Sequence, residues 1–149
     1  MQPAMSSRGV RVLRAIALLS IAGAVVSSVS LYHHYDSSPS SLCDFGANFN
    51  CDIVNRSIYS AVFGIPVALI GILGYGALLI LATFYRARAE APVMLLIASL
   101  AGLGFALYFT YVEAFVLAVW CILCLSSLTL ITAITVLSSV LVAQRMHKI

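Results

Sequence analysis

Four cysteines form two pairs along a chain of 149 residues, Cys43 with Cys51 and Cys121 with Cys124. Because a thiolate can attack a disulfide, pairs that meet in space can pass reducing equivalents by thiol–disulfide exchange. A spacing of three residues in a helix puts Cys121 and Cys124 on one face, one turn apart. Backbone N–H groups at a helix start also favour the attacking thiolate. The cysteines therefore predict an electron relay, provided that the surrounding elements bring the two pairs together.

Each pair also has a purely structural explanation. Cys43 and Cys51 enclose a short loop that a structural disulfide could close, although an exposed or strained bridge is the kind that exchanges. Cys121 and Cys124 could be small apolar side chains buried in a membrane helix. A zinc site built from all four cysteines is disfavoured, since no histidine has a matching spacing. We therefore predict no metal.

The rest of the chain is strongly apolar, with 62% hydrophobic and only 9% charged residues, against about 25% charged in typical soluble domains. A helical span needs about 20 apolar residues. Four stretches meet this requirement, and the predicted spans cover about 12–31, 61–84, 92–111 and 115–142. We expect a single all-α membrane domain over residues 1–149, built as a four-transmembrane-helix bundle.

Two alternatives for this apolar chain are disfavoured. The first apolar stretch is longer than the roughly 7–15 residues of a signal-peptide core, and no small-residue cleavage site follows it. We therefore expect a retained span. The basic residues lie at span ends and form no stripe suited to nucleic acid, so we expect no nucleic-acid partner.

The positions of arginine and lysine predict the orientation of the spans. The arginine-rich N-terminus, the link with Arg86 and Arg88 and the tail after Arg145 should face the cytoplasm. The loop 32–60 and the link near Glu113, which we expect to be a solvated turn residue, then face the opposite side. Both cysteine pairs are thereby placed outside the cytoplasm, where disulfides persist.

The loop 32–60 is the sizeable segment for which no span is predicted. A run of serines and one proline at 37–41 should end the first helix. After the loop cysteines, a short interfacial helix from Asn55 to Ser60 is expected, with Asn55 as its cap. The sequence Phe-Gly-Ile-Pro at 63–66 should then open the second span, with the proline in its first turn.

These motifs together resemble the vitamin K epoxide reductase family, in its short bacterial single-domain form. The resemblance rests on Cys-Asp-x6-Cys at 43–51, Ser57 six residues later, Phe-Gly-Ile-Pro at 63–66 and Cys-x-x-Cys at 121–124. It extends over nearly all of the chain from Leu31 onward. It implies a four-helix bundle around a quinone, either ubiquinone or menaquinone, in the cell inner (plasma) membrane with both termini cytoplasmic.

The resemblance also implies a path for electrons. A thioredoxin-like periplasmic protein, acting in trans, would attack Cys43, and the freed Cys51 would reduce the membrane disulfide through Cys121. Cys124 would then face the quinone. Ser57 stands at the family's Ser or Thr and could steady a thiolate or a quinone oxygen. A helix cap is an equally good explanation for Ser57.

The predicted quinone-binding residues lie near the sulfurs in the chain or in the bundle: Tyr59, Ser60, Phe63, Trp120 and Leu128. Ser60 and Leu128 stand where animal members use Asn and Tyr to hydrogen-bond a naphthoquinone, and leucine cannot donate. Plain quinone reduction is therefore favoured over epoxide reduction. The three aromatic side chains could instead be ordinary bundle or interface residues.

The resulting hypothesis is a thiol:quinone oxidoreductase that reoxidises a periplasmic thioredoxin-like protein and so supports disulfide bond formation. The rival from another class is a small four-span transporter or accessory membrane subunit with structural disulfides. Transporters tend to carry ionisable groups at mid-membrane, whereas those of this chain lie near the predicted span ends.

Overall fold

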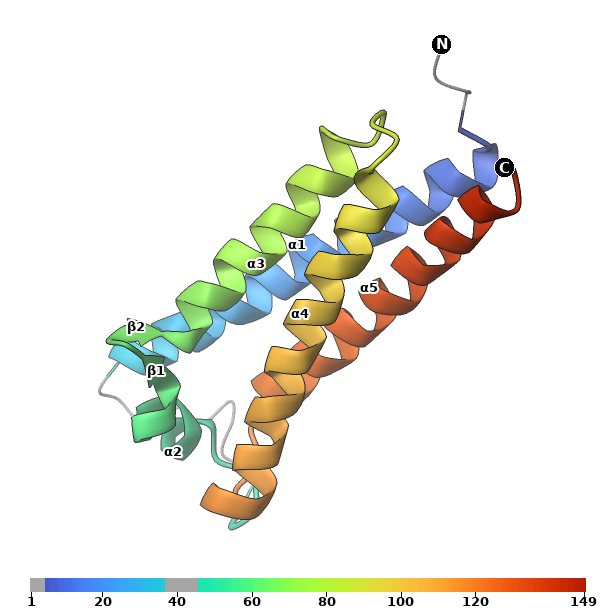
Figure 1. The fold of residues 1–149 in the computed structure, drawn as a ribbon. Helices are drawn as coiled ribbons and strands as arrows, with labels where there is room; N and C mark the ends of the chain where they lie inside the picture. Colours follow the sequence, from blue (N-terminus) through green and yellow to red (C-terminus); the bar gives the residue numbers. More distant parts are fainter. Residues whose placement is uncertain (1–4, 37–45) are drawn as a thin grey trace.

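The computed structural model describes residues 5–36 and 46–149. Cys43 and the serine-rich run at 37–41 lie outside these residues. Figure 1 shows a bundle of long helices, α1 (Ser7–Tyr35), α3 (Val67–Thr83), α4 (Ala91–Tyr111) and α5 (Ile122–Met146). A short helix α2 (Cys51–Arg56) and the strands β1 (Ala61–Val62) and β2 (Ile65–Pro66) lie between α1 and α3 in the chain. The predicted all-helical architecture is confirmed for the described residues, apart from these two-residue strands.

Within the described ranges, three helical segments are long and apolar enough to cross a membrane: Ser7–Tyr35, Ala91–Leu117 and Ile122–Met146. Helix α3 is also apolar but has only 17 residues, at the lower limit of the roughly 17–25 residues of spanning helices. The chain is therefore a largely helical multi-pass membrane protein, and the crossing by α3 stays a prediction.

Helix α1 extends beyond the predicted span 12–31 at both ends. It begins after Ser6, whose hydroxyl accepts a hydrogen bond from the backbone N–H of Gly9 at 3.3 Å. Its 29 residues correspond to roughly 43 Å at 1.5 Å per residue. Because this length exceeds a hydrocarbon core of about 30 Å, the ends of α1 project beyond the apolar layer.

The predicted start of the second span at Ala61 is wrong. Residues 61–66 form an antiparallel hairpin in which Val62 pairs with Ile65, and α3 begins only at Val67. The turn of the hairpin is made by Phe63 and Gly64, which both have positive φ values (52° and 81°). Two successive residues in this conformation cannot continue a right-handed helix, which explains why the apolar sequence does not form one here.

The predicted link around Glu113 is also wrong. Helix α4 continues through a π-helical turn, Val112–Leu117, and the chain leaves it at Ala118, which has a left-handed conformation (φ 53°). The backbone N–H of Val119 closes this turn on the carbonyl of Glu113 at 3.1 Å. As a result the fourth long helix begins at Ile122, seven residues later than predicted at 115.

The short helix of the loop lies earlier in the chain than predicted. Helix α2 starts at Cys51 and is capped by Asn50, whose side-chain oxygen accepts hydrogen bonds from the N–H groups of Asp52 and Ile53. Asn55, the predicted cap, is a buried residue inside α2. A single 3-10 turn, Ile58–Ser60, follows.

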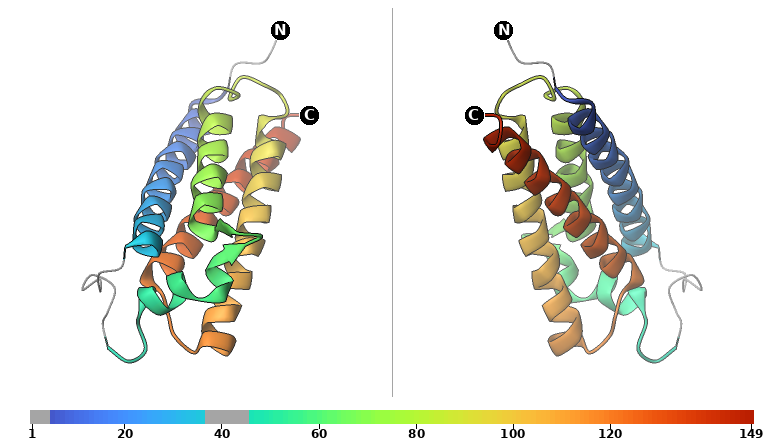
Figure 2. Two further views of the ribbon diagram at one scale, coloured as in Figure 1. Left: turned by 90° about the vertical axis from the view of Figure 1, so that its left-hand side faces the viewer. Right: turned by 90° about the vertical axis from the view of Figure 1, so that its right-hand side faces the viewer.

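The two ends of the bundle carry different elements. Figure 2 shows the start of α1, the end of α5 and the α3–α4 link at one end of the bundle. At the other end lie α2, the β1–β2 hairpin and the link between α4 and α5. Segments far apart in the sequence thus meet at this second end, which contains Cys51 and Cys121.

The long helices pack closely against one another, and small residues stand where two helices approach most closely. Ile16, Leu95 and Ile134 are fully buried in one hydrophobic cluster. A Cβ atom added at Gly23 would lie 2.2 Å from the ring of Tyr75, so α1 approaches α3 more closely than an alanine would allow. Small residues at such contacts let membrane helices pack backbone against backbone.

Candidate active site

The sulfur atoms of Cys51 and Cys121 lie 3.2 Å apart, although the two residues are 70 positions apart in the chain. Both side chains have no exposed surface, and with Val54 they form a small hydrophobic cluster of their own. Cys51 is disulfide-bonded, whereas Cys121 is a free thiol that donates a hydrogen bond to the Cys51 sulfur. This cluster, termed the sulfur junction below, brings a disulfide into contact with a thiol away from solvent.

A short pairing of backbone segments creates the sulfur junction. Phe49 and Trp120 form a parallel β-bridge, in which the N–H of Trp120 donates to the carbonyl of Asn48 at 2.9 Å and the N–H of Asn50 donates to the carbonyl of Trp120 at 3.1 Å. Cys51 and Cys121 directly follow the two paired segments. The Asn50 cap then turns the chain into α2 directly after the bridge.

Polar contacts hold α2 against the end of α1. The Ser30 hydroxyl donates to the side-chain oxygen of Asn55 at 2.9 Å, and Nδ1 of His34 lies 2.6 Å from the Asn55 carbonyl oxygen. Arg56 donates to the carbonyl of Asp36 at 2.6 Å. Because buried polar groups are costly when unpaired, these contacts fix the position of α2 and of Cys51 at its start.

Cys121 and Cys124 stand at the start of α5, as the sequence predicts. Cys121 occupies the N-cap position and Cys124 follows in the first turn. A hydrogen bond from the Cys124 thiol lowers the pKa of the Cys121 thiol, and burial opposes this effect. Since the thiolate is the form that attacks a disulfide, Cys121 reaches its reactive form more readily than an ordinary thiol, in the position that touches Cys51.

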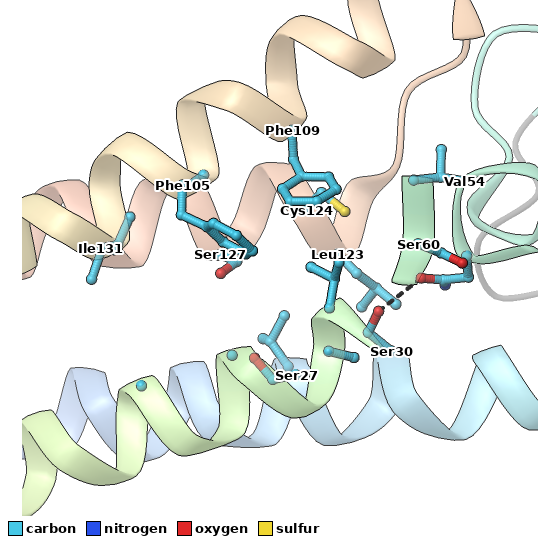
Figure 3. Close-up of a pocket in the computed structure, with 18 of the residues that line it drawn as sticks. Ser27, Ser30, Val54, Ser60, Phe105, Phe109, Leu123, Cys124, Ser127 and Ile131 are labelled. Atoms are coloured by element: carbon cyan, nitrogen blue, oxygen red, sulfur yellow. Dashed lines mark hydrogen bonds between the residues drawn. The ribbon is translucent and has the colours of Figure 1, made fainter. Parts of the chain in front are cut away.

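Cys124 faces a cavity of about 160 Å³ between the helices. Figure 3 shows side chains of α4 and α5, such as Phe109 and Ser127, approaching this space from one side and those of α1 from the other, with the Cys124 sulfur directed into it. The lining is mostly apolar. An engineered cavity of about 150 Å³ holds a benzene molecule, so the volume is suited to one ring of a flat apolar ligand.

A few polar groups converge on the otherwise apolar cavity. The Tyr75 hydroxyl donates to the Ser127 carbonyl at 2.9 Å and lies 2.8 Å from the Ser127 hydroxyl. Glu113 and His34 also line the cavity. Such a combination of apolar walls with a few placed polar groups is typical of a site for a small organic molecule.

The structure brings some of the predicted supporting residues to the cavity and leaves others elsewhere. Ser57, Tyr59 and Ser60 line it. Ser57 stands at the C-cap of α2, and its hydroxyl donates to the Val54 carbonyl at 2.8 Å; its side chain does not cap the 3-10 turn that follows. Ser60 in turn donates to the Ser57 carbonyl at 2.7 Å.

The other three predicted quinone-binding residues are not among the described residues that line the cavity: Phe63, Trp120 and Leu128. Phe63 is fully exposed because it forms the turn of the β1–β2 hairpin. Trp120 belongs to the bridge that holds the sulfur junction. Leu128 is half-buried on α5, one position past Ser127, and it is Ser127 that lines the cavity.

Glu113 is the main residue whose position the sequence prediction missed. Its side chain is 1% exposed instead of solvated, and its Oε2 atom accepts a hydrogen bond from the backbone N–H of Cys121 at 3.1 Å. The carboxylate also interacts with the Cys124 thiol. An acidic residue in an apolar stretch, eight positions before Cys121, could have indicated a buried functional group. Nothing in the sequence indicates the π-helical turn that directs this side chain inward.

The described residues contain no group of three or more His, Cys, Asp or Glu side chains arranged to hold a metal ion. Comparison with known families gives one finding: the sequence profile of the Vitamin K epoxide reductase family matches residues 14–139, most of the chain. No curated protein matches the chain.

Proposed function

Because the chain belongs to the vitamin K epoxide reductase family, whose members are membrane oxidoreductases that link thiols to quinones, we propose that it oxidises extracytoplasmic thiols and reduces a membrane quinone. The observation that carries the proposal is the 3.2 Å separation of the Cys51 and Cys121 sulfurs. At this distance a thiolate on one residue can attack a disulfide of the other without any rearrangement of the backbone.

The proposed electron path runs through both cysteine pairs. A thiol of the partner attacks the loop disulfide at Cys43, which lies outside the described residues, and releases Cys51 as a thiolate. Cys51 attacks the sulfur of Cys121 in the Cys121–Cys124 disulfide, and Cys124 leaves as a thiolate that takes up a proton. The partner's second thiol displaces Cys43 from the mixed disulfide, so that the partner leaves with its own disulfide. Cys43, now a thiol, attacks Cys51 and displaces Cys121, so that the loop disulfide is restored and the membrane pair holds two electrons as thiols.

The redox state of the described cysteines matches the end of this sequence. Cys51 is disulfide-bonded, and Cys121 and Cys124 are both free thiols. In this state the membrane pair is ready to give its two electrons to a quinone. The disulfide Cys121–Cys124 then re-forms, and the quinone becomes a quinol by taking up two electrons and two protons.

The cavity beside Cys124 is the proposed quinone site. Its apolar walls suit a quinone ring, and the hydroxyl groups of Tyr75, Ser57 and Ser60 lie at its surface, each donating to a carbonyl of the protein. A ring seated there lies next to the Cys124 sulfur and is separated from Cys51, which has no exposed surface. Ubiquinone and menaquinone are both candidates for the bound quinone.

The proposed partner is a thioredoxin-like protein acting in trans outside the cytoplasm. Since Cys51 is completely buried, an incoming protein thiol has no access to its sulfur, which favours Cys43 as the entry point. The arginine-rich N-terminus and the Arg86/Arg88 link lie at the opposite end of the bundle from the sulfur junction. By the distribution of positive charge, the sulfur end then faces the periplasm.

The test is quinone reduction by the purified protein in lipid nanodiscs, measured by quinone absorbance with soluble ubiquinone and menaquinone analogues. Two electron donors are compared, a reduced thioredoxin-like protein and the small dithiol dithiothreitol. Cys43→Ala should abolish the reaction with the protein donor and spare the reaction with the small dithiol, whereas Cys124→Ala should abolish both. Full turnover in all single cysteine variants would reject the proposal and favour the transporter or accessory subunit.

A further inference from the structure

Glu113 is a carboxylate buried where the cavity meets the cysteine pair. Its side chain is 1% exposed, and it lines the cavity together with Cys124. One carboxylate oxygen, Oε2, accepts the hydrogen bond from the Cys121 N–H. The other oxygen, Oε1, has no hydrogen-bond partner among the described residues.

The backbone holds this carboxylate in place by unusual means. Glu113 lies in the π-helical turn Val112–Leu117, and its own carbonyl accepts the N–H of Val119. π-Helical turns within α-helices occur frequently at functional sites. Burying a carboxyl group with one oxygen unpaired costs free energy that an alanine or leucine would avoid, so the side chain calls for a role beyond packing.

Quinone reduction requires a group that carries protons to the quinone oxygens, in addition to the cysteines that supply the electrons. Two electrons leave the cysteine pair as a disulfide forms, and the quinone oxygens must take up two protons. The Cys124 thiol interacts with the Glu113 carboxylate on the cavity side of the pair. We propose that Glu113 carries a proton between the Cys124 thiol and the quinone bound in the cavity, an inference that rests on the proposed function.

The step balances as follows when Cys121 is a thiolate. The S–H bond of Cys124 breaks and its proton passes to Oε1 of Glu113, while the sulfurs of Cys121 and Cys124 form a disulfide and two electrons pass to the quinone. Glu113 then gives its proton to one quinone oxygen, and water at the periplasmic end supplies the proton for the other. In the other half of the cycle, Glu113 takes up a proton from water at the periplasmic end and passes it to Cys124 when Cys51 displaces Cys124 from the disulfide.

Other titratable groups that line the same cavity are less suited to this role: His34, Tyr59 and Tyr75. Nδ1 of His34 is engaged with the Asn55 carbonyl oxygen at 2.6 Å, and the Tyr75 hydroxyl is engaged with Ser127. Among the described groups that contact the cysteine pair, Glu113 has a carboxyl oxygen, Oε1, that is not occupied by a hydrogen bond and can accept a proton.

The test is the variant Glu113→Gln, which keeps an oxygen to accept the Cys121 N–H but cannot carry a proton. Quinone reduction driven by dithiothreitol should fall about 100-fold or more, within the roughly 10²–10⁴ range of general acid–base catalysis. The remaining rate should rise about tenfold per pH unit, since hydroxide must then remove the Cys124 proton. Glu113→Asp should recover part of the rate, and Glu90→Gln, at an exposed glutamate before the other end of α4, should match the wild type.

A second measurement separates proton transfer from a structural role. In the Cys124→Ala background, the disulfide between Cys51 and Cys121 should form equally well with and without the added Glu113→Gln substitution, as measured by peptide mass analysis. Quinone reduction by Glu113→Gln at the wild-type rate, or equal loss of quinone reduction and of this disulfide, would overturn the inference while leaving the electron path intact. Absence of quinone reduction by the wild-type protein would instead overturn the proposed function and the inference with it.

Discussion

Cys121 and Cys124 are one helical turn apart but lie in different surroundings. Cys121 is fully buried and packs with Cys51 and Val54 in the sulfur junction. Cys124 is partly exposed and lines the cavity that also contains Glu113. The Cys121 side chain has the Cys51 sulfur as its neighbour, whereas the Cys124 side chain borders the cavity; the Glu113 carboxylate contacts Cys121 through its backbone N–H.

This difference separates two kinds of chemistry that a redox protein must combine. Thiol–disulfide exchange needs only three sulfurs in line, and a dry site protects its thiolate from side reactions. Reduction of an organic molecule needs room for a ring and a route for protons. Under the proposed function, these two requirements are met by cysteines one turn of α5 apart, so we expect changes on one side to leave the other side working.

The largest expected effect comes from removing the thiol on the cavity side. Cys124→Ser should reduce quinone turnover to background, and the Cys51–Cys121 disulfide should accumulate because Cys124 is no longer present to displace Cys51 from Cys121. Mass analysis of peptides under non-reducing conditions measures this disulfide. Thr129→Ala, at an exposed position further along α5, is the matched control. Loss of turnover without the trapped disulfide would contradict the division between the two sides.

A crowding substitution should damage the cavity side and leave the sulfur junction intact. Gly23→Ala places a methyl group 2.2 Å from the Tyr75 ring, which we expect to lower the free energy of unfolding by about 1–3 kcal/mol. Thermal unfolding in nanodiscs measures the loss. Gly104→Ala, where a Cβ would meet nothing within 4 Å, should be neutral or slightly stabilising. Equal stability of the two variants would mean that α1 and α3 approach less closely than described.

A change in the cap of α2 should affect the sulfur junction alone. Asn50→Ala removes the side-chain oxygen that caps the helix, at a local cost of about 1 kcal/mol, which corresponds to about a fivefold slower exchange between Cys51 and Cys121. Stopped-flow measurement with the protein donor tests this rate. Quinone reduction driven by a small dithiol should not change, and Asn48→Ala, at an exposed neighbour whose backbone makes the bridge, should behave as the wild type.

The smallest expected effect on quinone reduction comes from a substitution at Tyr75, which lines the cavity. Tyr75→Phe removes the hydroxyl that bonds Ser127, a loss of about 0.5–1.5 kcal/mol, and we expect the KM for quinone to rise about two- to tenfold. The exchange rate between the cysteine pairs should be unchanged. Tyr85→Phe, at an exposed tyrosine just past the far end of α3, is the control. A slower exchange in Tyr75→Phe would show that the two sides communicate.

The sequence was sufficient to predict the helical membrane class and the position of the Cys-x-x-Cys at a helix start. Both follow from local properties, the length of apolar stretches and the one-turn spacing of Cys121 and Cys124. The closeness of Cys51 and Cys121 was expected only through the resemblance to a family. Its physical cause, the bridge between Phe49 and Trp120, pairs two short segments whose sequences carry no strand signal.

The wrong span boundaries and the wrong link near Glu113 have a common cause: the backbone conformation of a few residues. Phe63 and Ala118 adopt positive φ values, which non-glycine residues rarely do, and each interrupts an apolar run that would otherwise be assigned to a span. The misplacement of Glu113 follows directly, because an extended α4 with a π-helical turn replaces the expected solvent-exposed link. Hydrophobicity alone could not distinguish these alternatives.

The parallel bridge between Phe49 and Trp120 is a weak contact compared with the packing of the long helices. The four long helices are held by packing along their length, whereas the segment before Cys51 meets the segment before Cys121 through two peptide hydrogen bonds, each worth on the order of 1 kcal/mol. On the proposed electron path, separating these few residues would block electron transfer from Cys51 to Cys121, while the long helices stayed packed against one another. We therefore expect that the proposed electron transfer can be lost without loss of the folded helical bundle.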